Sequence, residues 1–160
     1  LSDYISKRIF NLSSIAIANL IFAAILLFAY LRRKENITIL EVTTKAALII
    51  GIFQCMALVP GASRSGTAIT GALLVGLTMK DASKFAFLLS IPAIFGAIIF
   101  LIADFNNQDF VSISSLIGFL VSFIFAFFTI KYFLAFVEKI GMIPFVIYRV
   151  ILGLILLLLI

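Results

Sequence analysis

The sequence lacks histidine and tryptophan altogether and has a single cysteine, Cys55, among its 160 residues. The absence of histidine removes the commonest general base and the commonest metal ligand in proteins. A lone cysteine cannot form a disulfide within the chain, and its apolar surroundings predict a small buried residue. Charged residues make up only 12% of the chain, whereas soluble domains carry roughly twice that fraction. This scarcity of charge excludes an ordinary soluble domain.

Hydrophobic residues make up 64% of the chain and fall in helix-length runs. Because a helix needs about 20 apolar residues to cross a bilayer, we expect membrane-spanning helices at 10–31, 82–103, 111–133 and 141–160. The predicted fold is an all-α, polytopic transmembrane helical bundle that forms a single integral membrane domain over residues 1–160. The net charge of +5 mostly records loop topology. No basic stretch is interleaved with surface aromatics, so no nucleic-acid partner is expected.

Two further apolar stretches, 46–59 and 67–79, fall short of the roughly 20 residues that a spanning helix needs. They flank an irregular Pro-Gly turn, so we predict a re-entrant helical hairpin over about residues 43–79. Such a hairpin is tolerated only where its turn is buried in protein or lines a cavity. It would place the 104–109 loop, which has no Lys or Arg, opposite most of the basic residues, as the positive-inside rule requires. Those basic residues are Arg32, Arg33, Lys34, Lys45, Lys80, Lys84, Lys131 and Lys139.

Small residues recur at a spacing of four on both arms of the predicted hairpin. Such stripes let helix backbones approach closely, although any pair of packed membrane helices can carry them. The stripes are Ala47, Gly51 and Cys55 on the first arm and Ala68, Ala72 and Gly76 on the second.

The turn between the arms, Pro60-Gly-Ala-Ser-Arg-Ser-Gly66, has the residue types of a phosphate cradle. Gly61 permits a tight reversal, and Ser63 or Ser65 can cap the following helix, whose free N–H groups and positive dipole end attract anions. Arg64 adds a charged, planar fork of donors that suits phosphate. A charge at the bilayer centre costs about 2.5–3.5 kcal/mol, which favours a functional role. The alternative is that Ser63 only caps the helix and that Arg64 snorkels or pairs with an acid elsewhere.

Other polar residues lie near the turn or at membrane depth. Thr67 supplies a further hydroxyl, and Gln54 either contacts the turn or a ligand or bridges helices. Arg149 is near enough to a helix end to snorkel, so a structural role is favoured over substrate contact. Tyr148 beside it has the character of an interface anchor. No carboxylate or histidine lies near the turn in sequence, so the chain supplies an anion clamp without an evident base.

The chain contains the segments Gly51-Ile-Phe-Gln54, Leu58-Val-Pro-Gly-Ala-Ser-Arg-Ser-Gly66 and Phe85-Ala-Phe-Leu-Leu-Ser-Ile-Pro92. These segments resemble the C-terminal half of the bacterial undecaprenyl-diphosphatase family, the bacitracin-resistance membrane phosphatases. Tyr148-Arg149 with Gly153 resembles the final helix of that family. The sequence departs from the family pattern after the turn, where Ser-Gly is followed by Thr-Ala rather than Ala-Thr. The hydroxyl is thereby moved by about 100° around a helix.

The resemblance implies hydrolysis of undecaprenyl diphosphate to undecaprenyl phosphate and inorganic phosphate in the bacterial plasma (inner) membrane. It also implies that the chain is one half of an inverted-repeat membrane fold and a C-terminal fragment. The family's acidic motif and histidine lie in the N-terminal half, so that half is an expected partner. A divalent cation, Mg²⁺ or Ca²⁺, is expected to bind there, and no metal ligand is expected in this chain. Membrane lipids and a second copy in a homodimer are further expected partners.

The family's site residues carry over to positions of the turn and its neighbours. By this resemblance the catalytic residues are Arg64 and Ser63, and the substrate-binding residues are Ser65, Gly61, Gly66, Thr67 and Gln54. A transporter or flippase for an anionic polyprenyl lipid is the alternative, because broken helices in inverted repeats are also a transporter architecture. A purely structural bundle would leave an arginine at membrane depth unexplained.

Overall fold

The computed structural model describes residues 11–104 and 113–159, with side chains up to residue 100 in the first range. The regular elements within these ranges are all helical, which confirms the predicted all-α class. In chain order they are α2 (Leu12–Arg32), η1 (Ile39–Glu41), α3 (Thr44–Cys55), η2 (Met56–Leu58), α4 (Arg64–Leu74), α5 (Met79–Asp104), α6 (Ile113–Ile140) and α7 (Ile143–Leu158).

Among the described residues, three helices are long and apolar enough to cross a membrane: Leu12–Arg32, Met79–Phe100 and Ile113–Ile140. They confirm a polytopic helical membrane bundle. α7 has 16 residues and is shorter than the predicted span at 141–160. α3 and α4 have 12 and 11 residues and correspond to the two short arms.

The second arm begins at the first of the two predicted caps. Ser63 is the N-cap of α4 and accepts a hydrogen bond from the N–H of Gly66, so the helix starts at Arg64, three residues before the apolar stretch 67–79. It ends at Leu74, just before Gly76, whose φ of 102° is incompatible with a continuing helix. The chain then turns into α5 at Met79.

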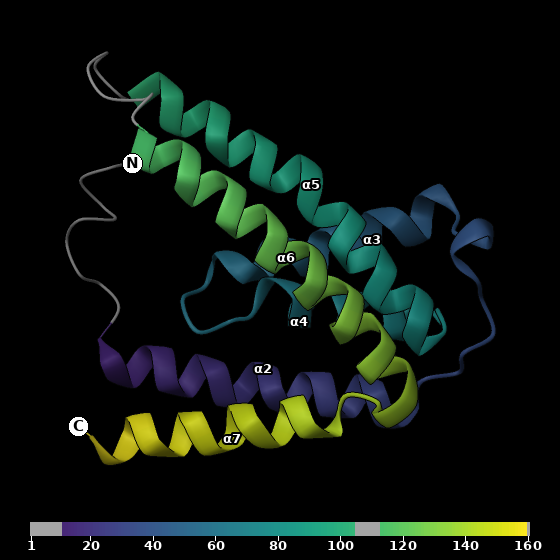
Figure 1. Ribbon diagram of the computed structural model, residues 1–160. Helices are drawn as coiled ribbons and strands as arrows, with labels where there is room; N and C mark the ends of the chain where they lie inside the picture. Colours follow the sequence, from purple (N-terminus) through teal and green to yellow (C-terminus); the bar gives the residue numbers. More distant parts are fainter. Residues whose placement is uncertain (1–10, 105–112, 160) are drawn as a thin grey trace.

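α4, the second arm of the short hairpin α3–α4, lies between two pairs of helices (Figure 1). α2 and α7 run antiparallel and side by side, while α5 and α6 form a second antiparallel pair. α4 occupies the centre, because every residue from Gly66 to Leu73 is buried. Its sequence makes this position possible, since Gly, Ala and Thr side chains let neighbouring backbones approach closely.

The two arms of the hairpin pack against each other, but the small residues predicted to form the contact on the first arm do not all take part in it. Ala68, Ala72 and Gly76 on the second arm are buried as expected. On the first arm the contact is made by Ile50 and Phe53, and a Cβ built at Gly71 would lie 2.8 Å from the Cβ of Phe53.

The prediction for the first arm was therefore wrong for two of its three small residues. A Cβ built at Gly51 would meet nothing within 4 Å, and Cys55, predicted to be buried, is exposed. The physical reason is that the apolar side chains on another face of α3 bury more surface against α4 than the small residues do.

The loop from residue 33 to residue 43 fastens the base of the hairpin. The N–H groups of Asn36 and Ile37 both donate to the carbonyl of Gly76 at 3.0 Å, and Thr78 N–H donates to Ile37 at 3.1 Å. The N–H and hydroxyl of Thr38 donate to the Glu41 carboxylate, and these bonds hold the pKa of Glu41 below its ordinary value. The bonds from Asn36, Ile37 and Thr78 hold the base of the hairpin, at Gly76, next to the start of α5.

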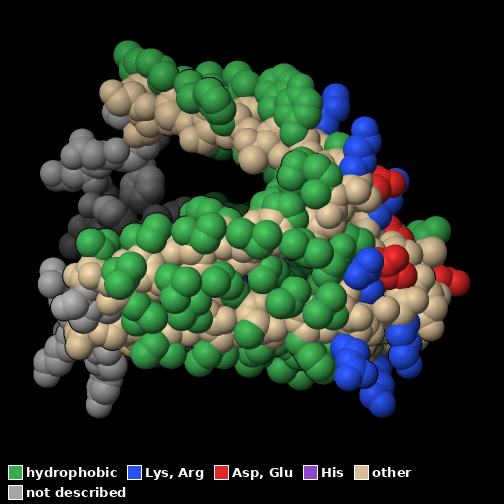
Figure 2. Space-filling model, turned by 90° about the horizontal axis from the view of Figure 1, so that it is seen from below, with side chains coloured by type: hydrophobic (Ala, Val, Ile, Leu, Met, Phe, Trp, Pro, Cys, Tyr) green, Lys and Arg blue, Asp and Glu red, His purple; other side chains and the backbone are tan. Residues whose placement is uncertain are grey.

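Charged side chains gather at the end of the molecule where this loop lies. Figure 2 shows Lys and Arg side chains at the right-hand end of one face, with hydrophobic side chains over most of the remainder. α2 and α6 finish at the same end, and α5 begins there (Figure 1). An ion pair between Lys80 of α5 and Glu138 of α6 measures 2.9 Å. This clustering is the asymmetry that the positive-inside rule predicts.

Candidate functional site

The tip of the hairpin is a tight turn that packs against the backbone of α2. Val59 and Ala62 N–H groups close the turn on the carbonyls of Met56 and Val59, respectively. Gly61 adopts a φ of 97°, and a Cβ there would collide with the Ile15 carbonyl oxygen. Glycine is needed here both for its backbone angle and for the close approach to α2.

The tip lies far from the charged end of the molecule. Ile15 is three residues from the start of α2 at Leu12 and 17 residues from its end at Arg32. At 1.5 Å per residue, the tip contacts α2 about 25 Å from the basic end and only about 5 Å from the other end.

The start of α4 presents hydroxyls and free helix N–H groups at this tip. Ser63 Oγ accepts a hydrogen bond from Gly66 N–H at 3.2 Å and lies 3.3 Å from Ser65 Oγ. The positive end of the helix dipole coincides with these two hydroxyls, an arrangement that attracts anions. The Thr67 hydroxyl is directed elsewhere, because it donates to the carbonyls of Ser63 and Arg64 at 3.1 and 2.9 Å.

Arg149 of α7 is fixed beside the same tip by three hydrogen bonds. Its Nε donates to Asn19 Oδ1 at 2.8 Å, and its Nη2 donates to the Gly61 carbonyl at 2.9 Å. Asn19 Nδ2 donates back to the Arg149 carbonyl at 2.7 Å. The arginine is 7% exposed. The guanidinium is therefore held in one orientation by α2 and by the turn.

One nitrogen of this guanidinium has no partner among the described residues. Arg149 Nη1 is buried and makes no hydrogen bond. A Cβ built at Gly66 would lie 3.1 Å from Nη1 and 3.3 Å from Ser63 Oγ. The nitrogen therefore faces the start of α4, and the missing side chain of Gly66 leaves room beside it. A buried, charged donor without an acceptor is costly, and an anionic ligand would satisfy it.

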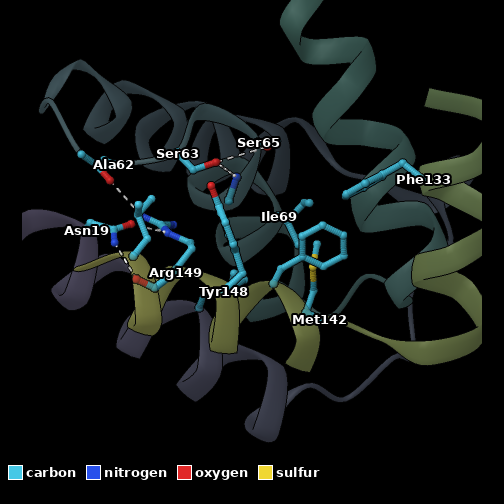
Figure 3. A pocket seen from close by; sticks show the side chains of 14 residues that line it. Asn19, Ala62, Ser63, Ser65, Ile69, Phe133, Met142, Tyr148 and Arg149 are labelled. Carbon is cyan, nitrogen blue, oxygen red and sulfur yellow. Dashed lines mark hydrogen bonds between the residues drawn. The ribbon is translucent and has the colours of Figure 1, made fainter. Parts of the chain in front are cut away.

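The two sides of this arrangement enclose a cavity of about 380 Å³. Figure 3 shows Asn19, Ala62 and Arg149 on one side, Ser63 and Ser65 above, and Ile69, Phe133 and Met142 on the other side. The residues that line the polar part are Asn19, Gly61, Ala62, Ser63, Ser65, Gly66, Tyr148 and Arg149. The apolar lining consists of Leu26, Ile69, Phe133, Met142, Phe145 and Leu152.

Arg64 and Gln54 line a different cavity, of about 290 Å³. Arg64 is exposed, and Gln54 Oε1 is buried without a hydrogen-bond partner in the described part of the chain. Ala93 and Ala97 of α5 also line this cavity. The predicted site residues thus separate into two sets: Gly61, Ser63, Ser65 and Gly66 share the first cavity, and Gln54 and Arg64 share the second.

The sequence alone did not identify Asn19 as a candidate, and for Arg149 it favoured a structural role over contact with a substrate. Both are polar residues inside apolar helices, which was the available signal. Their pairing joins residues 130 positions apart, so local sequence could not reveal it.

Among the described residues that line the cavity, none carries a carboxylate. Within residues 11–104 and 113–159, no group of three or more His, Cys, Asp or Glu residues lies together to hold a metal ion. Divalent cations such as Mg²⁺ and Ca²⁺ bind through carboxylate and carbonyl oxygens. The residues at this site therefore do not fit such a cation by themselves, and the expectation of ligands in an upstream half stays a prediction.

The helices and the central hairpin define a polytopic helical membrane protein with a polar cavity at the hairpin tip. The chain belongs to the family described as bacitracin resistance protein BacA, whose model matches residues 1–155. It is 42% identical over 156 residues to an undecaprenyl-diphosphatase of Saccharophagus degradans, a match that covers 96% of this chain and 58% of that protein. It is 40% identical over 153 residues to an undecaprenyl-diphosphatase of Alcanivorax borkumensis, covering 94% and 58%, respectively. The chain thus spans less than two thirds of the length of these relatives.

Proposed function

We propose that this chain forms the phosphate-binding part of a membrane phosphatase that converts undecaprenyl diphosphate to undecaprenyl phosphate and inorganic phosphate. The names of the two relatives support this substrate. The structural observation that carries the proposal is Arg149 Nη1, a buried donor that has no hydrogen-bond partner in the described part of the chain. It faces the start of α4 beside Ser63, and the site therefore has an unmet demand for a negative charge.

In this proposal the diphosphate bridges the N-terminus of α4. One phosphate accepts hydrogen bonds from Arg149 Nη1, Ser63 and Ser65, and the other phosphate lies toward Arg64 and Gln54. Gly66 allows the phosphate to approach the helix N-terminus closely. The Thr67 hydroxyl holds the first turn of α4 through its bonds to backbone carbonyls.

Hydrolysis breaks the bridging P–O bond as a water attacks the terminal phosphorus. The products are the lipid monophosphate and inorganic phosphate, and the proton lost by the water passes to a base. The described residues that line the cavity include no carboxylate or histidine to act as that base, so we assign it to the remainder of the longer protein. The role of Arg64, Arg149 and the two serines is to stabilise charge that grows on the phosphate oxygens.

We further propose that α3–α4 enters the bacterial plasma membrane from the cytoplasmic, basic side as a re-entrant hairpin. The tip then reaches close to the opposite face of the bilayer, because it contacts α2 near Ile15. An upstream half and a homodimer belong to the same proposal. Transport of an anionic lipid, the alternative function, is not favoured, since both relatives are named as diphosphatases.

The test is phosphate release from undecaprenyl diphosphate in detergent by the full-length protein that contains this chain. Arg64→Ala is compared with wild type and with Arg32→Ala, a control at the basic end of α2. We expect Arg64→Ala to lower kcat/KM by two or more orders of magnitude and Arg32→Ala to leave it within about threefold, with equal helix content by circular dichroism. A folded wild type that releases no phosphate, or an Arg64→Ala variant that matches it, would overturn the proposal.

A further inference from the structure

The cavity at the hairpin tip has two chemically different ends. Ser63, Ser65 and Arg149 make one end polar and positively charged, and Phe133, Met142 and Ile69 make the other end apolar. Tyr148 stands between them in Figure 3. An inorganic anion would use only the first end, whereas an amphiphile with a phosphate head would use both.

The apolar end is built from packed side chains contributed by several helices. Ile69 of α4 and Leu26 of α2 are 1% and 2% exposed, and Met142, just before α7, is 2% exposed. The rings of Phe133 on α6 and Phe145 on α7 meet edge to face, with centroids 5.0 Å apart. Such packing gives a preformed wall, as small-molecule sites usually have.

The two phenylalanines also line a second hollow. An aromatic groove of about 590 Å³ runs along α6 and shares Phe133 and Phe145 with the cavity. Its other lining residues are Phe125, Phe128, Thr129, Tyr132 and Phe136. The apolar end of the cavity and the groove therefore adjoin at the Phe133–Phe145 pair.

We propose that the apolar chain of a prenyl phosphate leaves the cavity past Phe133 and Phe145 and lies along this α6 groove. The inference rests on the proposed function and adds the path of the lipid to it. A cavity of about 380 Å³ is at the lower end of the size range of ligand pockets. It accommodates the head and the first chain units, and a longer chain must continue outside. The groove is the adjoining apolar surface that the cavity wall itself shares.

The first test maps the path directly by photolabelling. The full-length protein in detergent receives a farnesyl diphosphate analogue with a benzophenone at the end of its chain, and the labelled peptides are identified by mass spectrometry. The control probe is the corresponding farnesol, which has no phosphate. We expect labelling within 125–136 of α6 that depends on the diphosphate and is suppressed by excess undecaprenyl phosphate.

Three results would overturn the proposed lipid path. They are equal labelling yield from the farnesol probe, labelling instead at the α5–α6 groove that contains Leu88, Ile91 and Phe123, and no labelling at all. Labelling does not require turnover, so its outcome is independent of hydrolysis. If α6 is labelled only by the diphosphate probe and the protein releases no phosphate, the lipid path stands and the phosphatase proposal fails. If the protein releases phosphate and the label is found elsewhere, the phosphatase proposal stands and the lipid path fails.

The second test uses matched variants on one helix. Phe128 lines the proposed groove and Phe123 lines the groove on the α5 side, and both are exposed, at 47% and 62%. We expect Phe128→Ala to raise KM for undecaprenyl diphosphate roughly tenfold and Phe123→Ala to change it less than about twofold. Inhibition by inorganic phosphate should be equal in both variants. Equal KM values in the two variants would remove the groove from the path.

Discussion

Asn19 and Arg149 hold each other by two reciprocal hydrogen bonds, although they are 130 residues apart. Arg149 Nε donates to Asn19 Oδ1 at 2.8 Å, and Asn19 Nδ2 donates to the Arg149 carbonyl at 2.7 Å. The pair joins α2 and α7, the first and last long helical segments that the structure describes. It also aims the remaining guanidinium nitrogens at the hairpin tip, so one contact serves both the fold and the candidate site.

Replacing Asn19 by Ala should therefore destabilise the protein and weaken the site together. We expect a loss of about 2–4 kcal/mol of unfolding free energy, because the buried guanidinium and the carbonyl of Arg149 each lose one hydrogen-bond partner. Thermal unfolding in detergent measures this loss. The matched control is Asn11→Ala, since Asn11 is exposed and its side chain makes no capping bond. Equal midpoints for the two variants would contradict the structural role of the pair.

Gly66→Ala should impair phosphate binding without unfolding the protein. The new methyl group would lie about 3 Å from Arg149 Nη1 and from Ser63 Oγ, in the space proposed for the phosphate. Alanine is also the better helix former by about 1 kcal/mol, so stability should not fall. We expect the Ki of inorganic phosphate to rise at least about tenfold.

The control for that substitution is Gly51→Ala in α3. Gly51 is also helical, and nothing lies within 4 Å of a Cβ built there. The Ki of phosphate should stay at its wild-type value in this variant. A Gly66→Ala protein with wild-type Ki would place the phosphate elsewhere.

Gly61→Ala should damage the tip itself. Alanine at a φ of 97° is strained by at least about 1–2 kcal/mol, and its Cβ would also collide with the Ile15 carbonyl. We expect a lower unfolding midpoint in detergent and a loss of phosphate release. Gly96→Ala in α5, which meets nothing within 4 Å, should unfold like wild type. If both variants unfold alike, the close approach of the tip to α2 is not present in the protein.

The hydroxyls near the turn should divide into two groups by their kinetic effect. Ser63→Ala and Ser65→Ala remove groups that line the cavity, and we expect each to reduce kcat/KM at least about tenfold. Thr67→Val keeps the side-chain shape and removes bonds to backbone carbonyls only, so it should cost about 0.5–1.5 kcal/mol of stability with kcat/KM within about threefold. A large kinetic effect of Thr67→Val with unchanged stability would instead assign its hydroxyl to the substrate, as the family resemblance implies.

The sequence predicted the helical architecture well where run length decides the structure. The long apolar runs became α2, α5 and α6, and the short runs on either side of Pro60 became α3 and α4. It could not predict which face of α3 packs on α4. Residues at a spacing of four occur on several faces of α3, and the face that packs on α4 is the one that carries Ile50 and Phe53.

The candidate site was predictable only in its local part. Gly61, Ser63 and Ser65 follow from turn and capping chemistry, which acts over a few residues. The separation of Arg64 from the serines was not predicted, although successive residues at the start of a helix project about 100° apart and do not all face one phosphate group. The clamp by Asn19 and Arg149 depends on how α2 and α7 meet, which sequence alone does not encode locally.

The hydrogen bond from Arg149 Nη2 to the Gly61 carbonyl has a mechanical consequence. It ties the hairpin tip to α7 and, through the Arg149–Asn19 pair, to α2, which is long and apolar enough to cross a membrane, so the tip cannot shift in depth while α2 and α7 stay in place. A carrier has to present its binding site to each side in turn, and a tip tied in this way resists that motion. A hydrolase needs no such motion. Its site can remain stationary while substrate and product diffuse laterally to and from it.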